Sequence, residues 1–117
     1  MDKKEIITEL NNLNNLEDSN FKAFYIYTCI IECLKNIYFN LYGFIYKEKY
    51  EYISDIYVLL EHINQKDINF KNNHSTLYNI LPVIVDWKMI LKEDYITFDP
   101  DIIKDGIQVI NQLLEEI

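Results

Sequence analysis

Two cysteines and two histidines are the side chains of this chain with the widest chemical range. Cys29 and Cys33 are four residues apart, which places both thiols on one face of a helix. A tetrahedral zinc site needs four ligands and usually brings them in close pairs, whereas His62 and His74 are twelve residues apart. Two cysteines are also too few for a disulfide framework. We therefore predict two small buried thiols, with no metal and no cofactor.

Either histidine is of the type that serves as a general base. We expect His62 to close a helix, where the helix dipole favours a cation, and His74 to lie in a loop just before Ser75. Neither has a nearby acid or nucleophile in a recognised arrangement, although the sequence leaves Cys–His catalysis open. The two glycines could hardly build a phosphate-binding loop, and HExxH and GxSxG are absent. The prediction is a protein that is not an enzyme.

Two charges interrupt the most apolar stretch of the chain, residues 23–46. Glu32 and Lys35 lie about one helical turn apart and can pair with each other. Ionised residues at mid-depth argue against a membrane span and favour a buried helix of a soluble bundle. One interpretation is a polar strip at the rim of that helix, because burying two charges completely is costly. The other is an interface strip that faces a second subunit or a partner.

The net charge of −8 is unevenly distributed, and all eleven basic residues are lysines. Residues 93–117 contain seven carboxylates against Lys104 alone, a net charge of −6. A nucleic-acid-binding protein normally shows a basic patch, so we expect no direct binding to nucleic acid. The acidic region is either a solvated face or a contact face for a basic partner. Ten tyrosines exceed what one small core accommodates, so some should lie at a partner surface.

The pattern of apolar residues predicts an all-α protein, a compact antiparallel bundle of about five helices in one domain, residues 1–117. With two glycines and two prolines, little material remains for tight turns. No cleavable leader is visible at the N-terminus, and we expect a cytoplasmic protein. The predicted helices are 2–16, 21–42 ending at Gly43, 46–64, one opened by Ser75 with a kink or restart at Pro82, and one opened by Asp99-Pro100-Asp101.

Apolar stripes at helical spacing indicate which faces should be buried. The segment 21–42 carries two of them and is apolar nearly all round, so we expect it to be central. The predicted stripes are Phe24, Tyr27, Ile31, Leu34, Tyr38 and Leu41; Ile26, Ile30 and Ile37; Tyr46, Tyr50, Ile53, Tyr57 and Leu60; and Ile103, Ile107, Ile110, Leu114 and Ile117. The last is a narrow seam for the core or for a second copy.

Three segments together resemble HEPN domains and the related substrate-binding partners of minimal nucleotidyltransferases. They are AFYIYTCIIECLKNIYFNLYGF, YISDIYVLLEHI and WKMILKEDYITFDPDIIKDGIQVINQLLEEI. The resemblance covers most of the chain beyond residue 20. It implies a compact helical bundle that pairs as a homodimer or with a nucleotidyltransferase partner.

The ribonucleases of that family rely on an arginine followed, after four to six residues, by a histidine. This chain has no arginine, and the positions that match before His74 are Asp67, Ile68 and Asn69. Those before His62 are Asp55, Ile56 and Tyr57. The resemblance therefore implies a member that does not cleave RNA and works by binding.

These observations predict an acidic helical protein that binds and blocks or stabilises another protein with a basic surface. An immunity protein, an antitoxin-like component or a phage-encoded inhibitor acts in this way. The predicted contacts are Asp94, Tyr95, Asp99, Asp101 and Asp105. The alternative, from the family resemblance, is a HEPN-type toxin or a nucleotidyltransferase accessory subunit acting on RNA or nucleotides.

Overall fold

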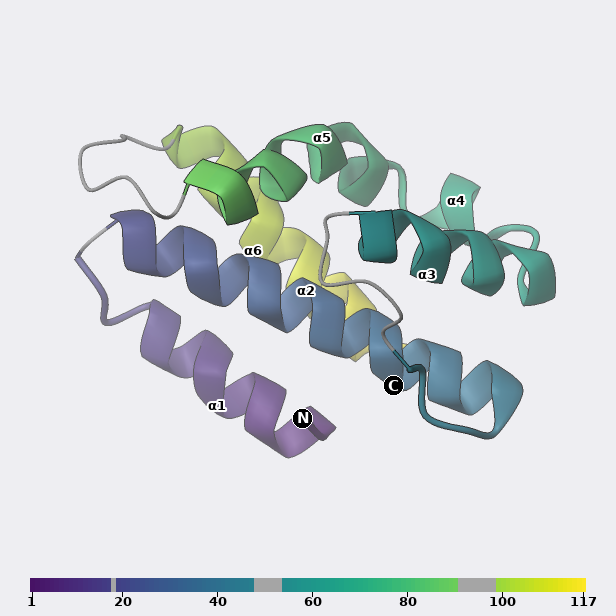
Figure 1. Ribbon diagram of the computed structural model, residues 1–117. Helices are drawn as coiled ribbons and strands as arrows, with labels where there is room; N and C mark the ends of the chain where they lie inside the picture. Colours follow the sequence, from purple (N-terminus) through teal and green to yellow (C-terminus); the bar gives the residue numbers. More distant parts are fainter. Residues whose placement is uncertain (18, 48–53, 91–98) are drawn as a thin grey trace.

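The computed structural model of the chain describes residues 1–17, 19–47, 54–90 and 99–117. All regular structure within these residues is helical. The helices are α1 (Lys3–Leu13), α2 (Ser19–Tyr42), α3 (Ser54–Lys66), α4 (Phe70–Asn73), α5 (Ser75–Ile90) and α6 (Pro100–Leu114) (Figure 1). Their compact arrangement has a radius of gyration of 13.7 Å. The predicted all-α class is confirmed, and α4 is a short helix that the sequence pattern did not predict.

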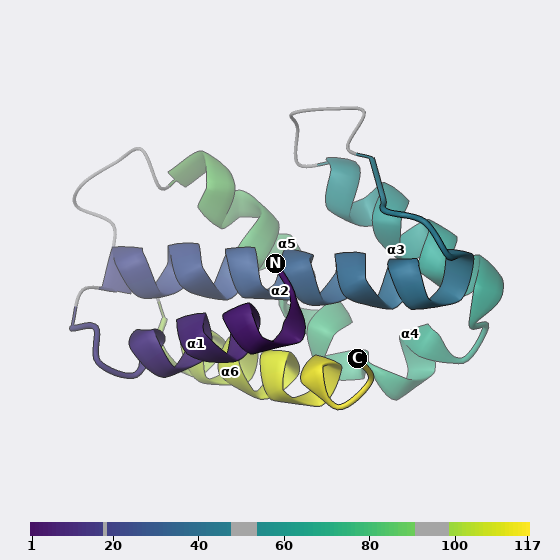
Figure 2. The same cartoon turned by 90° about the horizontal axis from the view of Figure 1, so that it is seen from below.

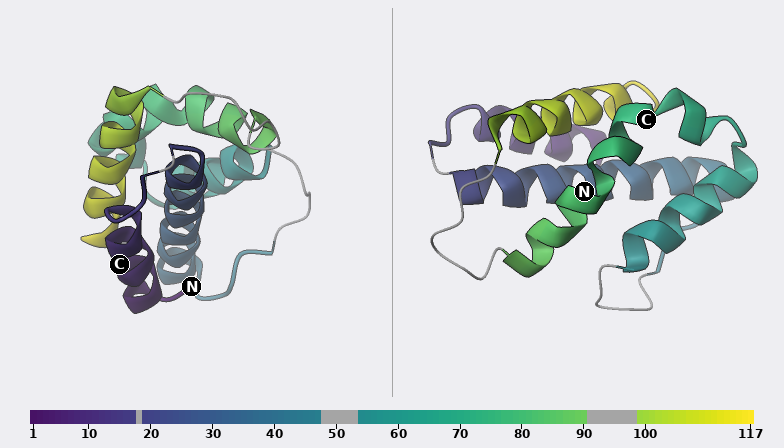
Figure 3. Two further views of the ribbon diagram at one scale, coloured as in Figure 1. Left: turned by 90° about the vertical axis from the view of Figure 1, so that its left-hand side faces the viewer. Right: turned by 90° about the horizontal axis from the view of Figure 1, so that it is seen from above.

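Helix α2 is the centre of the fold, as its apolar character predicted. It contacts α1, α3, α5 and α6, which surround it when the molecule is seen end-on (Figure 3). α1 runs antiparallel to α2, whereas α6 crosses α2 in the same general direction (Figure 2). The N-terminal ends of α2 and α6 therefore lie at one end of the molecule. The C-terminal end of α2 lies at the other end.

Local capping signals explain where several helices begin and end. Asp2 caps α1 by accepting a hydrogen bond from the backbone N–H of Glu5, whose side chain accepts one from Asp2 in return. Asp99 caps α6 by accepting from the N–H of Asp101 at 2.8 Å. Gly43 ends α2 with φ of +79°, a left-handed conformation that glycine adopts without strain. These three boundaries follow from the sequence.

The deeply buried face of α2 contains the whole second predicted stripe and only Leu34 and Tyr38 of the first. Ile26 and Ile30 are fully buried, whereas Phe24 is exposed. The buried positions of α2 are Ala23, Ile26, Cys29, Ile30, Cys33, Leu34, Ile37 and Tyr38. In α6 the buried face is likewise rotated from the predicted seam. It consists of Gly106, Val109, Ile110, Leu113 and Leu114, while Ile103, Ile107 and Ile117 are only partly buried.

The boundaries of the middle helices differ from the predicted ones. Tyr46 and Lys47 are not helical, so the predicted start of this helix at residue 46 is wrong. Of its predicted stripe, Leu60 is buried and Tyr57 is exposed, while Tyr50 and Ile53 lie outside the described residues. α3 continues to Lys66, which places His62 one turn before its end. Pro82 lies inside α5, which continues through it. Ser75 is the first residue of α5, and His74 occupies the cap between α4 and α5.

The loop predicted for residues 65–74 contains a buried anchor. Phe70 is fully buried in the single turn of α4 and stacks against the His74 ring, with 4.3 Å between ring centroids. Asn64 ties this turn to its neighbours, because its side chain accepts a hydrogen bond from the N–H of Lys71 and donates one to the Tyr78 hydroxyl. Burial raises the pKa of Tyr78, and the hydrogen bond from Asn64 opposes that rise. Phe70 thus attaches the otherwise polar segment 65–74 to the core.

Candidate partner-binding surfaces

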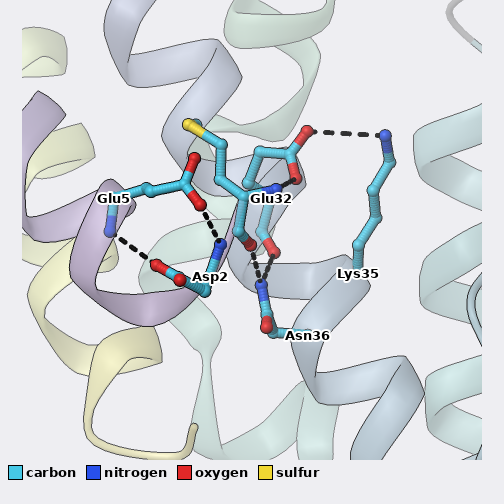
Figure 4. Close-up of polar contacts among 6 residues, drawn as sticks. Asp2, Glu5, Glu32, Lys35 and Asn36 are labelled. Carbon is cyan, nitrogen blue, oxygen red and sulfur yellow. Dashed lines mark hydrogen bonds and ion pairs between the residues drawn. The ribbon is translucent and has the colours of Figure 1, made fainter.

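Glu32 and Lys35 form the predicted pair, and the chain terminus adds a third charge to it. Glu32 Oε1 lies 3.6 Å from Lys35 Nζ, and its Oε2 lies 2.8 Å from the ammonium group of Met1 (Figure 4). The Asn36 amide donates to the carbonyl oxygens of Met1 and Glu32. The side chains of Glu32 and Lys35 are 20% and 25% exposed. The strip therefore lies at the rim of α2, where it holds the start of α1.

We expect Glu32→Gln to lower the free energy of unfolding by about 1 kcal/mol. The change removes the carboxylate that two cations share, and partly exposed ion pairs contribute on this scale. Glu32→Lys should cost more, since it places three cations together. Chemical denaturation at low and high salt is the measurement, with Glu61→Gln, an exposed acid of α3, as the control. An equal loss at high salt would contradict the electrostatic explanation.

The predicted acidic contacts are distributed over the beginning of α6. Asp99 and Asp101 are exposed, and Asp105 is half-buried one turn further on. Asp94 and Tyr95 lie outside the described residues. Asp99 is required locally because its side chain caps α6. Asp101 lies in the first turn of α6, where the positive end of the helix dipole stabilises its negative charge. The helix cap thus gives Asp99 a structural role. Asp101 is exposed to solvent.

Two exposed phenylalanines lie at the same end of the molecule, which the sequence did not predict. α2 and α6 cross where Ile26 faces Gly106, and both helices begin at that end (Figure 2). Phe21 and Phe24, five and two residues before the crossing on α2, are both exposed. The carboxylates at the start of α6 lie at this same end, and aromatic residues are enriched at protein-binding surfaces. The signal in the sequence for this exposure was that Phe21 and Phe24 precede the stripe Ile26, Ile30 and Ile37, which is the buried one.

The opposite end of α2 carries a cluster of aromatic rings. Tyr38 stacks on Tyr42 at 4.4 Å and meets Phe44 and Tyr46 edge-on at 5.5 Å and 5.2 Å. The Tyr42 hydroxyl donates to the backbone carbonyl of His62 at 2.6 Å, which ties α2 to α3. The three tyrosine rings therefore pack against the core at the end of α2, and Phe44 is the exposed ring of the cluster. This use of the tyrosines is internal, whereas the prediction from their number placed some at a partner surface.

Two cavities adjoin this cluster, and Ile45 lines both. The first, about 270 Å³, is lined by Met1, Asp2, Glu32, Lys35, Asn36, Phe39 and Ile45. The second, about 410 Å³, is lined by Tyr38, Phe44, Ile45, Tyr46, Lys47 and His62. Phe39, Phe44 and Ile45 are 47%, 56% and 73% exposed, and we call these three residues the α2-end surface. In the sequence, the α2-end surface was indicated only by Phe44 and Ile45, two apolar residues that follow the end of α2 at Gly43.

The cysteines are buried as predicted, and their surroundings suppress ionisation. Burial, with smaller contributions from the nearby carboxylates of Glu9 and Glu32, raises the pKa of Cys29 to about 12. Burial likewise raises the pKa of Cys33 to about 12, with contributions from Cys29 and Glu32. Both thiols are free in the fold. Because the thiolate is the reactive form, neither is suited to nucleophilic chemistry in the folded protein.

The two histidines occupy different surroundings. His74 is 4% exposed, with Nε2 2.8 Å from Oε2 of Glu116, but the groups are not aligned as a hydrogen bond. His62 is half-buried beside Tyr38 and Tyr42. Across the described part of the chain, no three His, Cys, Asp or Glu side chains gather to hold a metal ion. His74 is the non-helical residue just before Ser75, as predicted, but it is buried there, against Phe70 and close to Glu116.

Comparisons with known proteins add nothing to this description. No family model, no curated protein and no solved structure matches the chain. In the portion that the structure describes, every helix is too short or too polar to cross a membrane.

Proposed function

We propose that this protein binds another protein through the end of the molecule where α2 and α6 begin. The contact surface consists of Asp99, Asp101 and Asp105 with the exposed rings of Phe21 and Phe24. The predicted contacts Asp94 and Tyr95, which precede Asp99 in the sequence, are included as candidates for the test. The partner presents a basic surface, which the protein blocks or stabilises as an immunity protein, an antitoxin or a phage-encoded inhibitor does. The protein acts by occupying that surface and not by catalysis.

The observation that carries this proposal is the combination of exposed aromatic rings and carboxylates at one end of the bundle. Phe21 and Phe24 are exposed although they belong to α2, the central and largely apolar helix. Aromatic side chains contribute much of the binding energy at protein interfaces, and opposite charges accelerate the encounter. The crossing of α2 and α6 at Gly106 brings the two kinds of residue to the same end.

The test compares two pairs of carboxylates of equal charge. Proteins captured from a lysate of the source cells by the wild-type chain are identified, and the affinity of each purified candidate is measured. We expect Asp99→Asn/Asp101→Asn to weaken binding at least tenfold, mainly through slower association, because Asn keeps the helix cap while removing the charge. The control Glu61→Gln/Glu115→Gln removes two exposed acids from other parts of the molecule.

Further variants locate the contact more closely. Adding Asp94→Asn and Asp105→Asn should increase the loss, and Phe21→Ala or Tyr95→Ala should accelerate dissociation. If all four aspartates are neutralised and the affinity stays unchanged, this surface is not the binding site. An equal loss in the control pair would attribute the effect to net charge and would also contradict the proposal.

The family resemblance supports a second candidate, an RNA- or nucleotide-directed toxin or accessory subunit. No described contact favours it, because His74 is enclosed and the positions before both histidines lack arginine. An RNA-cleavage assay on the purified protein separates the two candidates. Cleavage that is lost in His62→Ala would favour the second.

A further inference from the structure

We propose that a second copy of this chain docks on the α2-end surface, so that the protein is a two-fold symmetric dimer. Ile45 of each copy occupies the partner's pair of cavities. This interface lies at the opposite end of the molecule from the surface of the proposed function and does not depend on it. The argument rests on the shape, charge and burial of the residues around Ile45.

Shape is the first reason to choose a second copy as the occupant. The α2-end surface combines three protruding apolar side chains with two cavities, and Ile45 lines both cavities. A two-fold interface requires one patch to be complementary to itself, because each residue of one copy meets the same patch on the other. A surface with protrusions and cavities side by side meets this requirement.

Charge is the second reason. The chain as a whole carries −8, so two copies repel each other in most orientations. The cavity linings, in contrast, carry both signs, with Asp2 and Glu32 against Lys35 and Lys47. Approach through the α2-end surface also keeps the acidic ends of both copies far apart. Among the surfaces described, this one opposes self-association least.

The position of Glu32 and Lys35 is the third reason. Both line the first cavity together with Ile45, and in the single chain they remain 20% and 25% exposed. Their charges are already paired with each other and with the Met1 ammonium. A neighbour that covers them would therefore bury no unpaired ion, which avoids the largest penalty of a charged interface. The interpretation of Glu32 and Lys35 as part of an interface thus acquires a specific partner, a second copy of the chain.

Mass in solution as a function of concentration tests the proposal. The wild-type chain should shift toward twice its 14.1 kDa mass as its concentration rises in sedimentation equilibrium. Ile45→Asp should weaken association at least tenfold and remain a monomer, because the new carboxylate would lose its contact with water in the interface. Ile68→Asp is the matched control, since Ile68 is 80% exposed outside the α2-end surface and receives the same charge. It should associate like the wild type.

A cross-linking experiment examines the geometry independently. In the proposed dimer the two Ile45 side chains approach each other, because each occupies cavities that the other lines. Ile45→Cys should therefore form a disulfide-linked dimer under mild oxidation, and Ile68→Cys should not. The native thiols are buried and do not compete.

Several outcomes would overturn the proposal. One is a wild-type chain that stays at 14.1 kDa up to about 1 mM, beyond which association is too weak to be specific. Another is a dimer that Ile45→Asp leaves intact while circular dichroism shows an unchanged fold. A mass that grows without limit would indicate head-to-tail association and would exclude the closed two-fold dimer.

Discussion

Replacing Gly106 with alanine is expected to destabilise the fold by about 2 kcal/mol, although alanine is the better helix former. A β-carbon at position 106 would lie 2.6 Å from Cγ2 of Ile26, closer than two carbon atoms can approach. Cγ2 is attached directly to the Ile26 β-carbon, so α2 and α6 must move apart to relieve the contact. Overpacking of this kind costs about 3 kcal/mol at its upper range, against about 1 kcal/mol gained in helix propensity.

A double-mutant cycle isolates this contact. Ile26→Ala removes Cγ2, so Gly106→Ala should cost much less in that background, as measured by urea denaturation. Gly43→Ala is the control, because its cost of about 1 kcal/mol arises from the left-handed backbone and should be equal in both backgrounds. Stabilisation by Gly106→Ala alone, or an equal cost in both backgrounds, would show that the helices do not cross at this position.

Alkaline pH is expected to destabilise the protein through its two thiols. The folded-state pKa of Cys29 and of Cys33 is about 12, compared with an ordinary value of 9.0. Between these values the folded state retains protons that the unfolded state releases, so stability is complete below pH 9 and is lost as pH rises toward 12. The loss at pH 10 is about 1.4 kcal/mol for each thiol.

Urea denaturation between about pH 8 and pH 10 measures this effect. The variant Cys29→Ala/Cys33→Ala lacks both thiols and should show a shallower loss of stability, and the difference separates the thiols from the tyrosines. Iodoacetamide provides a second measurement, because a rise of about three pKa units lowers the thiolate fraction about a thousandfold. The folded protein should therefore react that much more slowly than the protein in urea. Rapid labelling of the folded chain would contradict the burial of both thiols.

The class of the fold, and those helix boundaries that depend on neighbouring residues, could be predicted from the sequence. Asp99-Pro100-Asp101 begins a helix and Gly43 ends one, because a cap and a left-handed residue act within a single turn. The pairing of Glu32 with Lys35 belongs to the same group, since three-residue spacing in a helix brings them together. The assignment of Asp94, Tyr95, Asp99, Asp101 and Asp105 to a partner stays a prediction.

Which helix faces are buried, and which residues lie beside them, depends on how the helices pack together. A helix that is apolar nearly all round has no single face that its sequence marks for burial. The packing of the neighbouring helices on α2 therefore determines that Ile26 and Ile30 are buried and that Phe24 is exposed. The close crossing at Gly106, the anchor at Phe70 and the cavities beside Ile45 each join segments distant in sequence. Periodicity describes one helix at a time, whereas these contacts arise when several helices compete to cover the same apolar surface.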